Sequence, residues 1–524
     1  MKRSIHLYLL MFAVFYHGCS SKNQESTDTG LGIIDFEVSS NSPQAVDHFE
    51  RGVLWLHSFM YEEAAQSFRL AQESDPDFAL AYWGEVMTYN HPLWLEQNYE
   101  KAAAALKNLA PTSEARIEKA QTTFEKDIFK AAEILYGEGD KVSRDDAYAE
   151  YMAELNQKYP DNHEVAAFHA LALLGSVEEG RDYIIYGKAA AIAQRILDEN
   201  PKHPGALHYL IHSYDDPNHA SLAVEAADNY SKVAPDAGHA LHMPSHIYIA
   251  LGRWDDVIAS NIRSFEASLK KIEEDSASRW NLHAYHWLMY GHLQQGELDE
   301  ADRIMKNLTG YIKSDQSDYA RAYFIDMLGN YSAETGQWNH EYNLIQVSDS
   351  DLNVISRVGQ AFISGMGAVE NKKFDQAENI ISEMETEMQN AQNKLVSKGI
   401  TVCSGVSTAS RAPSRADLDQ AKVLTLILKA KLAVAEDKND EHVEAMLKEA
   451  VALEISIPFL FGPPQVYLPS YEAYGEWLIK KGRYEESIFQ FKKSLEKGPG
   501  RSRALGGIDK AEKQLASEKL TERS

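Results

Sequence analysis

The stretch that decides the fold is "YEAYGEWLIKKGRYEESIFQFKKSLEKGPG", residues 471–500. Its helical periodicity on both sides of Gly482 predicts two helices joined by a tight turn. Gly475 stands where the two helices must approach closely, and Phe491 stands where a bulky side chain fills the groove between them. Pro499 follows the second helix, as expected for a residue that cannot continue it. One such pair cannot bury its own apolar face, so the pattern must repeat.

The same order of residues occurs near the other end of the chain, in "FERGVLWLHSFMYEEAAQSFRLAQESDPDFALAYWG", residues 49–84. There the small and bulky positions are Gly52, Trp55, Ala64 and Phe68. Both units resemble the tetratricopeptide repeat (TPR), a helix-turn-helix of 34 residues. Weaker copies surround glycines 252, 296 and 336, whose wider spacing indicates helices longer than the standard ones. The sequence therefore predicts an all-α fold, an irregular TPR-type α-solenoid of antiparallel helix pairs.

The chain begins "MKRSIHLYLLMFAVFYHGCS", in which two basic residues precede an apolar run that is too short to span a bilayer. Residues 1–18 are typical of a secretory signal peptide. Gly18 and Cys19 resemble the end of the bacterial lipobox, in which the cysteine is lipidated and becomes the new N-terminus. Residues 19–42 then serve as the lipidated cysteine and a flexible tether. A plain secretory signal followed by an incidental cysteine is the alternative.

The mature chain resembles a group of bacterial TPR lipoproteins, largely without assigned activity. The resemblance is carried by "FALAYWGEVMTYNHPLW" (78–94), "HALHMPSHIYIALGRWDDVIASN" (239–261) and "HWLMYGHLQQGELDEA" (286–301). It implies the fold and an exported protein that is lipid-anchored in the cell envelope, at the outer membrane. It implies no reaction.

Two loops interrupt the predicted helices and divide the chain's second half. We expect an N-terminal array with His-rich repeats over residues 43–310 and a C-terminal array over 311–524. The segment 397–417 is rich in Ser, Gly and Thr, and the segment 456–470 holds four prolines, so both are predicted to be loops. The second loop is also apolar, which favours packing on a surface, either as part of a binding face or as cover for a helix end.

Composition excludes several classes of function. The formal net charge is -26 and no basic tract is present, which argues against a nucleic-acid partner. Two cysteines provide no disulfide framework. Phosphate-binding loops, nucleophile elbows and kinase signatures are missing from the sequence, so it gives no support for an enzyme activity.

Ten of the nineteen histidines lie between residues 203 and 292. They begin in "HPGALHYLIHSYDDPNHA", residues 203–220, where Pro204 favours a helix that runs to Tyr214. Histidines four apart on one helix face can chelate a metal ion, and a nearby aspartate can add an oxygen ligand. Pro244 should break the next helix between its histidines. The candidate ligand or metal pocket consists of His208, His212, Asp215, His242, His246 and His286.

These histidines have three interpretations, which we rank as interhelical packing first, a ligand pocket second and a metal centre third. The functions follow the same order. The leading hypothesis is a non-catalytic binding scaffold for a protein, a peptide or an extended ligand, with the membrane contacted through the lipid anchor alone. The alternatives are an accessory lipoprotein in polysaccharide binding or degradation, and a metal-dependent enzyme or metal carrier. No cofactor is expected for the first two, and a divalent transition metal is expected for the third.

Overall fold

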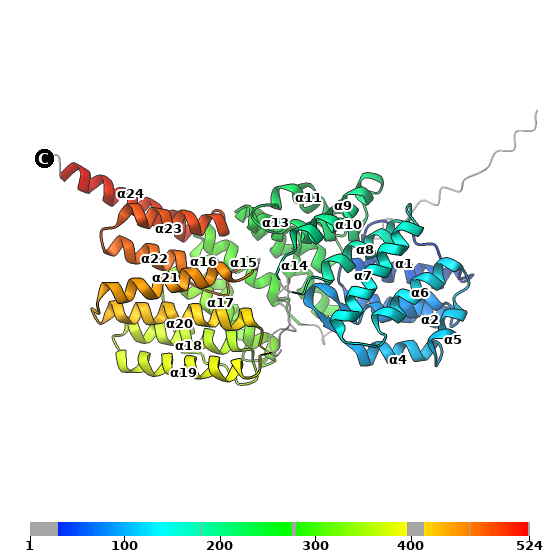
Figure 1. Ribbon diagram of the computed structural model, residues 1–524, viewed down its shortest axis with the longest axis horizontal. Coiled ribbons are helices and arrows are strands. Elements are labelled where there is room, and N and C mark those ends of the chain that lie inside the picture. The colour runs from blue at the N-terminus through cyan, green and yellow to red at the C-terminus, as the bar shows by residue number, and fades with distance from the viewer. Residues whose placement is uncertain (1–29, 179, 275–278, 396–412, 461, 522–524) are drawn as a thin grey trace, which may run out of the picture.

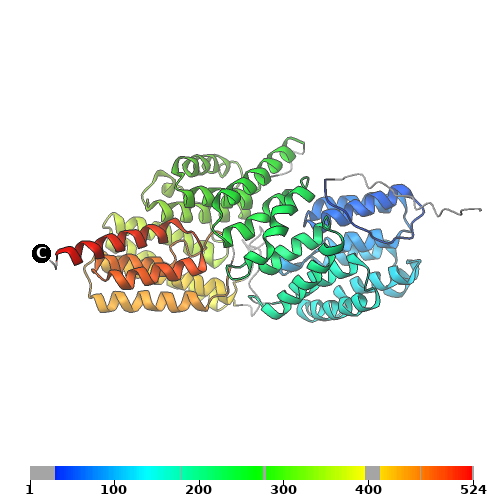
Figure 2. The same ribbon diagram turned by 90° about the horizontal axis from the view of Figure 1, so that it is seen from above.

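The computed structural model describes residues 30–178, 180–274, 279–395, 413–460 and 462–521. Within these residues the chain is an elongated array of helices, with the N-terminal half at one end, the C-terminal half at the other and residues near 250 between them (Figures 1 and 2). The predicted signal peptide, Cys19 and most of the loop 397–417 lie outside the described residues.

The first half of the array consists of helices joined by short turns, with one two-stranded antiparallel ribbon between α3 and α4. Its elements are α1 (Pro43–His57), α2 (Tyr61–Ser74), α3 (Ala79–Met87), β1 (Asn90–His91), the 3-10 helix η1 (Pro92–Trp94), β2 (Glu96–Gln97), α4 (Tyr99–Leu109), α5 (Ser113–Lys119), α6 (Thr123–Leu135), α7 (Lys141–Lys158), α8 (His163–Gly175), α9 (Tyr183–Glu199), α10 (Pro204–Tyr214), η2 (Ala220–Ala223), α11 (Val224–Val233), α12 (Gly238–His242) and α13 (Pro244–Ala250).

The second half contains longer helices, and those from α18 to α23 lie side by side as a stack (Figure 1). Its elements are α14 (Trp254–Glu274), α15 (Leu282–Gln295), α16 (Leu298–Tyr311), α17 (Asp318–Thr335), η3 (Glu341–Leu344), α18 (Val354–Glu370), α19 (Phe374–Gln392), α20 (Arg415–Ala435), α21 (Asp440–Ser456), α22 (Ser470–Lys480), α23 (Tyr484–Lys497) and α24 (Ser502–Thr521).

The TPR-type packing predicted from the two repeat units is confirmed. Phe491 of α23 is fully buried, and a Cβ added at Gly475 of α22 would lie 2.8 Å from its ring. The same ring faces Gly507 of α24. The aromatic side chain of α23 thus occupies space left by glycines on the helix before and the helix after it. Gly482 joins α22 to α23 with a φ of +72°, which explains the need for glycine in this turn.

At the N-terminal end Phe68 of α2 has the same position between Gly52 of α1 and Gly84 of α3. Ala64 and Trp55 are buried in the same core. Pro499 lies between α23 and α24, as the repeat pattern requires. The fold is therefore an all-α, irregular solenoid of antiparallel helix pairs.

The C-terminal hairpin returns to the middle of the array. Trp254 Nε1 donates to the carbonyl oxygen of Gly500 at 2.9 Å, and the backbone N–H of Ser502 donates to Gln294 at 2.9 Å. The guanidinium of Arg501, buried between these segments, pairs with Glu472 at 2.6 Å and with Glu334 at 2.9 Å. These contacts fasten the segment before α24 to α14, α15 and α17.

The apolar residues of the array form two hydrophobic cores. The described residues form one hydrophobic core that extends from Leu31 to Val257 and also includes Trp287 and Tyr290, and a second that begins at Phe265. The two cores therefore meet along α14 and α15, where these long helices supply side chains to both.

Residues 30–42 do not behave as a flexible tether. Leu31 and Phe36 are buried in the first core. The N–H of Ile33 donates to the carbonyl oxygen of Lys202 at 3.0 Å, and that of Ser39 donates to Glu125 at 2.8 Å. The predicted tether boundary at residue 42 is therefore wrong, because the apolar side chains of this segment have a groove to fill.

The two predicted loops differ in outcome. Helix α20 begins at Arg415 with a capping box between Ser414 and Asp417, so the first loop ends before residue 417. In the described part of 457–469 the chain is non-helical, and Tyr467 is buried with its hydroxyl donating to Asp326 at 3.0 Å. The described helices are all too short or too polar to cross a bilayer.

Candidate metal centre

The histidine-rich segments meet where α10, α12, α13 and α15 pack together. Helix α10 runs from Pro204 to Tyr214 as predicted, capped by the side chain of His203. Pro244 begins α13 directly after α12 ends at His242, so the predicted interruption is present. This interruption places His242 at the end of one short helix and His246 in the first turn of the next.

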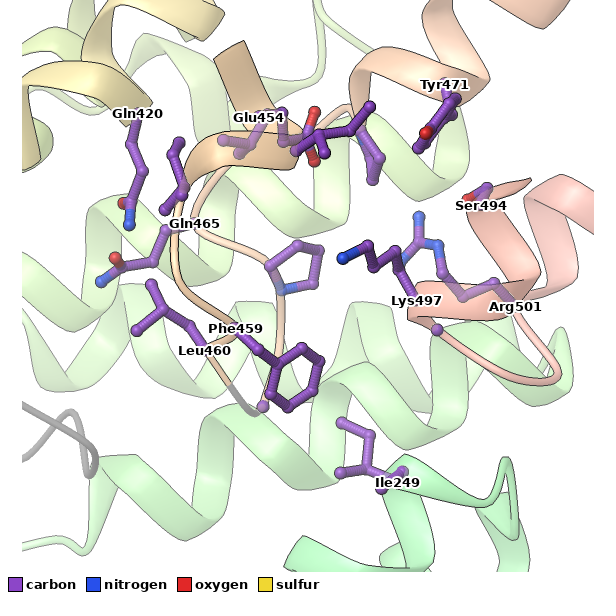
Figure 3. Close-up of a pocket in the computed structure, with 18 of the residues that line it drawn as sticks. Ile249, Gln420, Glu454, Phe459, Leu460, Gln465, Tyr471, Ser494, Lys497 and Arg501 are labelled. Carbon is purple, nitrogen blue, oxygen red and sulfur yellow. The ribbon is translucent and has the colours of Figure 1, made fainter. Parts of the chain in front are cut away.

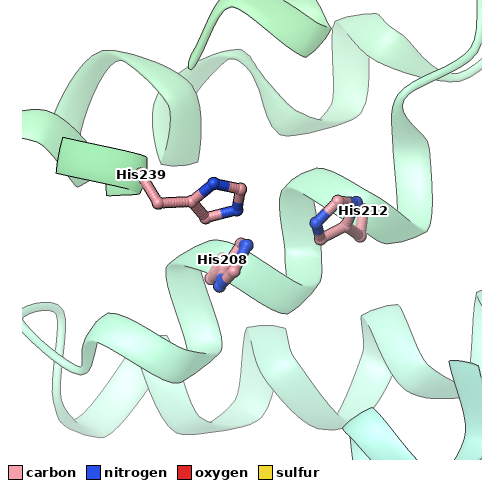
Figure 4. A group of neighbouring side chains, drawn as sticks. All are labelled: His208, His212 and His239. Atoms are coloured by element: carbon pink, nitrogen blue, oxygen red, sulfur yellow. The ribbon is translucent and has the colours of Figure 1, made fainter. Parts of the chain in front are cut away.

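Six histidines converge there as two groups of three, which we call the first and second triads. In each group one ring nitrogen per residue lies within 4.8 Å of the others. Figure 4 shows the rings of the first triad turned toward one another, two from α10 and one from α12. The first triad is His208, His212 and His239, and the second triad is His242, His246 and His283.

The hydrogen bonds of three rings fix which nitrogen carries the proton. His208 Nδ1 lies 2.7 Å from the backbone carbonyl oxygen of His57, so Nδ1–H is the donor and Nε2 holds a lone pair. His242 Nδ1 lies 2.7 Å from Asn261 Oδ1 and His246 Nδ1 lies 3.1 Å from Asp215 Oδ2, with the same consequence. Three unprotonated Nε2 atoms therefore face the interior of the cluster.

Two ring nitrogens of the first triad are buried without a donor, and the nitrogens of the second triad face one another. His208 Nε2 and His239 Nε2 have no hydrogen-bond partner among the described residues. His242 Nε2 lies 3.1 Å from His246 Nε2 and 2.9 Å from His283 Nε2. Two lone pairs facing each other at 3.1 Å repel, and a cation between them removes the repulsion. Two imidazole nitrogens bound tetrahedrally at about 2.0–2.1 Å from zinc lie about 3.3 Å apart, close to the spacing here.

Asp215 connects the two triads. Its Oδ2 lies 3.3 Å from His212 Nδ1 and 3.1 Å from His246 Nδ1, and its other oxygen pairs with the guanidinium of Arg181. Both the carboxylate and the guanidinium are buried. Because Asp215 faces the Nδ1 side of both rings, it orients the ligands, which is the usual role of a carboxylate behind metal-bound imidazole.

Burial keeps the imidazoles of the cluster neutral. It lowers the pKa of His208 to about 3 and that of His242 to about 4. Burial, together with the neighbouring imidazoles, also holds the pKa of His212, His239, His246 and His283 well below the usual value. Neutral imidazole is the form that binds metal ions.

Four of the predicted histidines, His208, His212, His242 and His246, lie in the triads, whereas the predicted His286 lies outside both. His286 is three residues after His283, so it is turned by about 60° around the helix. Its ring faces Tyr323, with the ring centroids 6.1 Å apart, and it belongs to neither triad. His239 and His283 complete the triads instead. Both are half-buried, whereas the other four are buried, so these two residues form the more exposed edge of the cluster.

A third group, His57, Glu164 and His203, lies directly behind the first triad and was missed by the sequence analysis. Glu164 accepts from both imidazoles, at 2.7 Å from His57 Nε2 and 3.1 Å from His203 Nε2. The remaining ring nitrogens contact Tyr209 and the backbone N–H of Ala206. Burial raises the pKa of Glu164, but the two histidines lower it further, to about 2. Its nitrogens are all paired, so this group supports the fold around the first triad.

The proline-rich loop 457–469 connects the cluster to a cavity of about 180 Å³. Trp287 stacks on His246 with the ring centroids 4.8 Å apart, and Gly462 of the loop packs against the same tryptophan. Figure 3 shows Phe459 and Leu460 of the loop facing the cavity, with Lys497 and Arg501 on the opposite wall. The loop therefore lines an apolar cavity that has the Lys497 amine on its wall, whereas the Arg501 guanidinium is already paired with Glu472 and Glu334.

Comparison with known proteins adds the solenoid likeness alone. No family model matches the sequence, and no curated protein matches it. Yeast Tom70 is 11% identical, with 91% of this chain and 90% of that chain covered and a TM-score of 0.32. A human IFIT1 dimer is 12% identical, with 92% of this chain and 96% of that chain covered and a TM-score of 0.35. The P58(IPK) TPR domain is 14% identical, with 90% of this chain and 99% of that chain covered and a TM-score of 0.21. At these scores the likeness does not extend to function.

Proposed function

We propose that this protein binds a transition-metal ion in the histidine cluster, as a metal carrier or as the metal-binding part of an enzyme. The proposal is carried by the buried Nε2 lone pair of His208 and by the opposed Nε2 atoms of His242 and His246. The His208 nitrogen has no hydrogen-bond partner among the described residues, so a metal ion would stabilise it, and a metal ion would also relieve the repulsion between the His242 and His246 nitrogens.

The donor chemistry restricts the metal. Neutral imidazole nitrogens suit zinc, copper, nickel and cobalt, whereas magnesium and calcium require oxygen ligands. Each triad offers three imidazole ligands, the number found in open zinc sites that keep a fourth position for water or substrate. The half-buried His239 and His283 lie at the edge of the cluster where this position would face solvent.

Metal analysis of the full mature chain, purified without an affinity tag, tests the proposal. We expect at least one equivalent of zinc or copper per chain after dialysis against metal-free buffer. The double variant His208→Ala with His242→Ala should lose it, and His442→Ala, which removes an exposed histidine on α21, should retain it. Substoichiometric metal that is the same in all three proteins would overturn the proposal.

A second role, as a scaffold for a protein or peptide, is supported by the cavity beside the loop 457–469. Its apolar lining and the amine of Lys497 favour an extended ligand that carries apolar side chains and an acidic group. The Gly18–Cys19 pair supports attachment of this scaffold to the outer membrane through lipid. Mass spectrometry of the native N-terminus should find an acylated Cys19, and Cys19→Ser should move the protein to the soluble fraction.

A further inference from the structure

The six histidines of the cluster cannot all serve one metal ion. Ligand nitrogens bound to one ion at about 2.0–2.1 Å lie at most about 4.2 Å apart. Among the described residues the ligand atoms form groups of three, and none larger, within a limit of 4.8 Å. The two triads share no residue, so each defines its own point of convergence.

The triads are nevertheless adjacent. The ring centroids of His212 in the first triad and His246 in the second are 5.4 Å apart, and those of His239 and His242 are 6.1 Å apart. One oxygen of Asp215 contacts the Nδ1 side of His212 and of His246, one ring from each triad. A single carboxylate, held by Arg181, thus orients one ligand in each group.

The two triads also have matching construction. Each contains two buried imidazoles, one half-buried imidazole at the open edge and an Nδ1–H bonded to a fixed acceptor, which is the His57 carbonyl oxygen in the first and Asn261 in the second. Each contains at least one Nε2 lone pair directed inward. One metal ion could bind the nitrogens of only one triad, so it would leave the matching nitrogens of the other triad without a ligand.

We infer that the cluster holds two transition-metal ions, one per triad, as an adjacent pair with Asp215 shared behind both. This inference rests on the proposed function and specifies its stoichiometry. Three neutral nitrogens per ion would leave each ion a further position for a small oxygen-donor ligand, such as hydroxide. The metal class is a divalent transition metal such as zinc or copper, because the proposed ligands are imidazoles alone.

Native mass spectrometry of the chelator-treated, tag-free chain titrated with zinc chloride tests the inference. We expect two zinc ions in the parent protein and in the control His442→Ala. His239→Ala and His283→Ala should each bind one zinc ion, and the variant that combines these two substitutions should bind none. Asp215→Asn should weaken the binding of both ions about 10-fold or more, because the carboxylate contacts one histidine ring of each triad. The parent stoichiometry alone is decisive even where a variant fails to fold.

The outcomes separate the two proposals. One zinc per parent chain would overturn the pair and leave the proposed metal binding intact, whereas no zinc would overturn both. Electron paramagnetic resonance of the protein loaded with two equivalents of copper(II) tests the adjacency. A magnetically coupled or silent signal is expected, and two isolated copper signals would refute the adjacent pair.

Discussion

The repeat packing predicts opposite outcomes for the same substitution at two helical glycines. In Gly84→Ala the new methyl group would lie 2.2 Å from the Phe68 ring, which is fully buried and also faces Gly52. Carbon atoms normally approach to about 3.5–4.0 Å, so the ring or the helix must move. Such overpacking costs about 1–3 kcal/mol, against a gain of about 0.5–1 kcal/mol from helix propensity.

We therefore expect Gly84→Ala to lower the free energy of unfolding by about 1–2 kcal/mol. Gly187 lies inside α9 with no atom within 4 Å of an added Cβ, so Gly187→Ala should raise it by about 0.5–1 kcal/mol. Urea unfolding followed by far-ultraviolet circular dichroism measures both. Equal stabilisation by the two substitutions would refute the close approach of α2 and α3.

A double-mutant cycle identifies the atom responsible. Phe68→Leu removes the ring that meets the new methyl group, so Gly84→Ala should cost less in the Phe68→Leu background than in the parent protein. We expect a favourable coupling energy of about 1–2 kcal/mol between the two sites. A coupling energy near zero would show that the cost of Gly84→Ala arises elsewhere.

Three further predictions concern titration and metal content. Burial raises the pKa of Asp326 from its ordinary value of 3.8 to about 7, so ionisation of this carboxyl group destabilises the fold as the pH rises between these values. Asp326→Asn should therefore increase the free energy of unfolding by up to about 4 kcal/mol at pH 8 and change it little at pH 4, measured by urea unfolding. In the metal-free protein, burial lowers the pKa of His242 from 6.5 to about 4, so the neutral imidazole contributes stability above pH 6.5 that is lost as the pH falls through 4. The loss should reach about 3 kcal/mol, measured by thermal unfolding between pH 7 and 4 in the presence of a chelator. A stability that does not change with pH would contradict burial as the cause. Zinc should raise the unfolding temperature of the parent protein at pH 7, and an equal rise in His208→Ala with His242→Ala would contradict binding at the cluster.

The sequence specified the helix pairs because the information for them is local. Gly475, Gly482 and Phe491 occur at fixed offsets within one 30-residue stretch, and the same offsets at Gly52 and Phe68 indicated repetition. The break at Pro244 and the helix from Pro204 to Tyr214 were predictable for the same reason, since proline acts on its own backbone. The packing of segment 30–42 was missed although five of its thirteen residues are large and apolar, because the surface on which they pack is formed by segments far along the chain, such as the one at Lys202.

The sequence also indicated which segments carry the histidines, and it paired His208 with His212 by helical spacing. Only the tertiary structure decided which nitrogens meet. His208 is oriented by the carbonyl oxygen of His57, 151 residues earlier in the chain, and His246 is oriented by Asp215, 31 residues earlier. Such partners are set by how successive helix pairs stack, and a stacking angle is a property of the packed solenoid that no local spacing encodes.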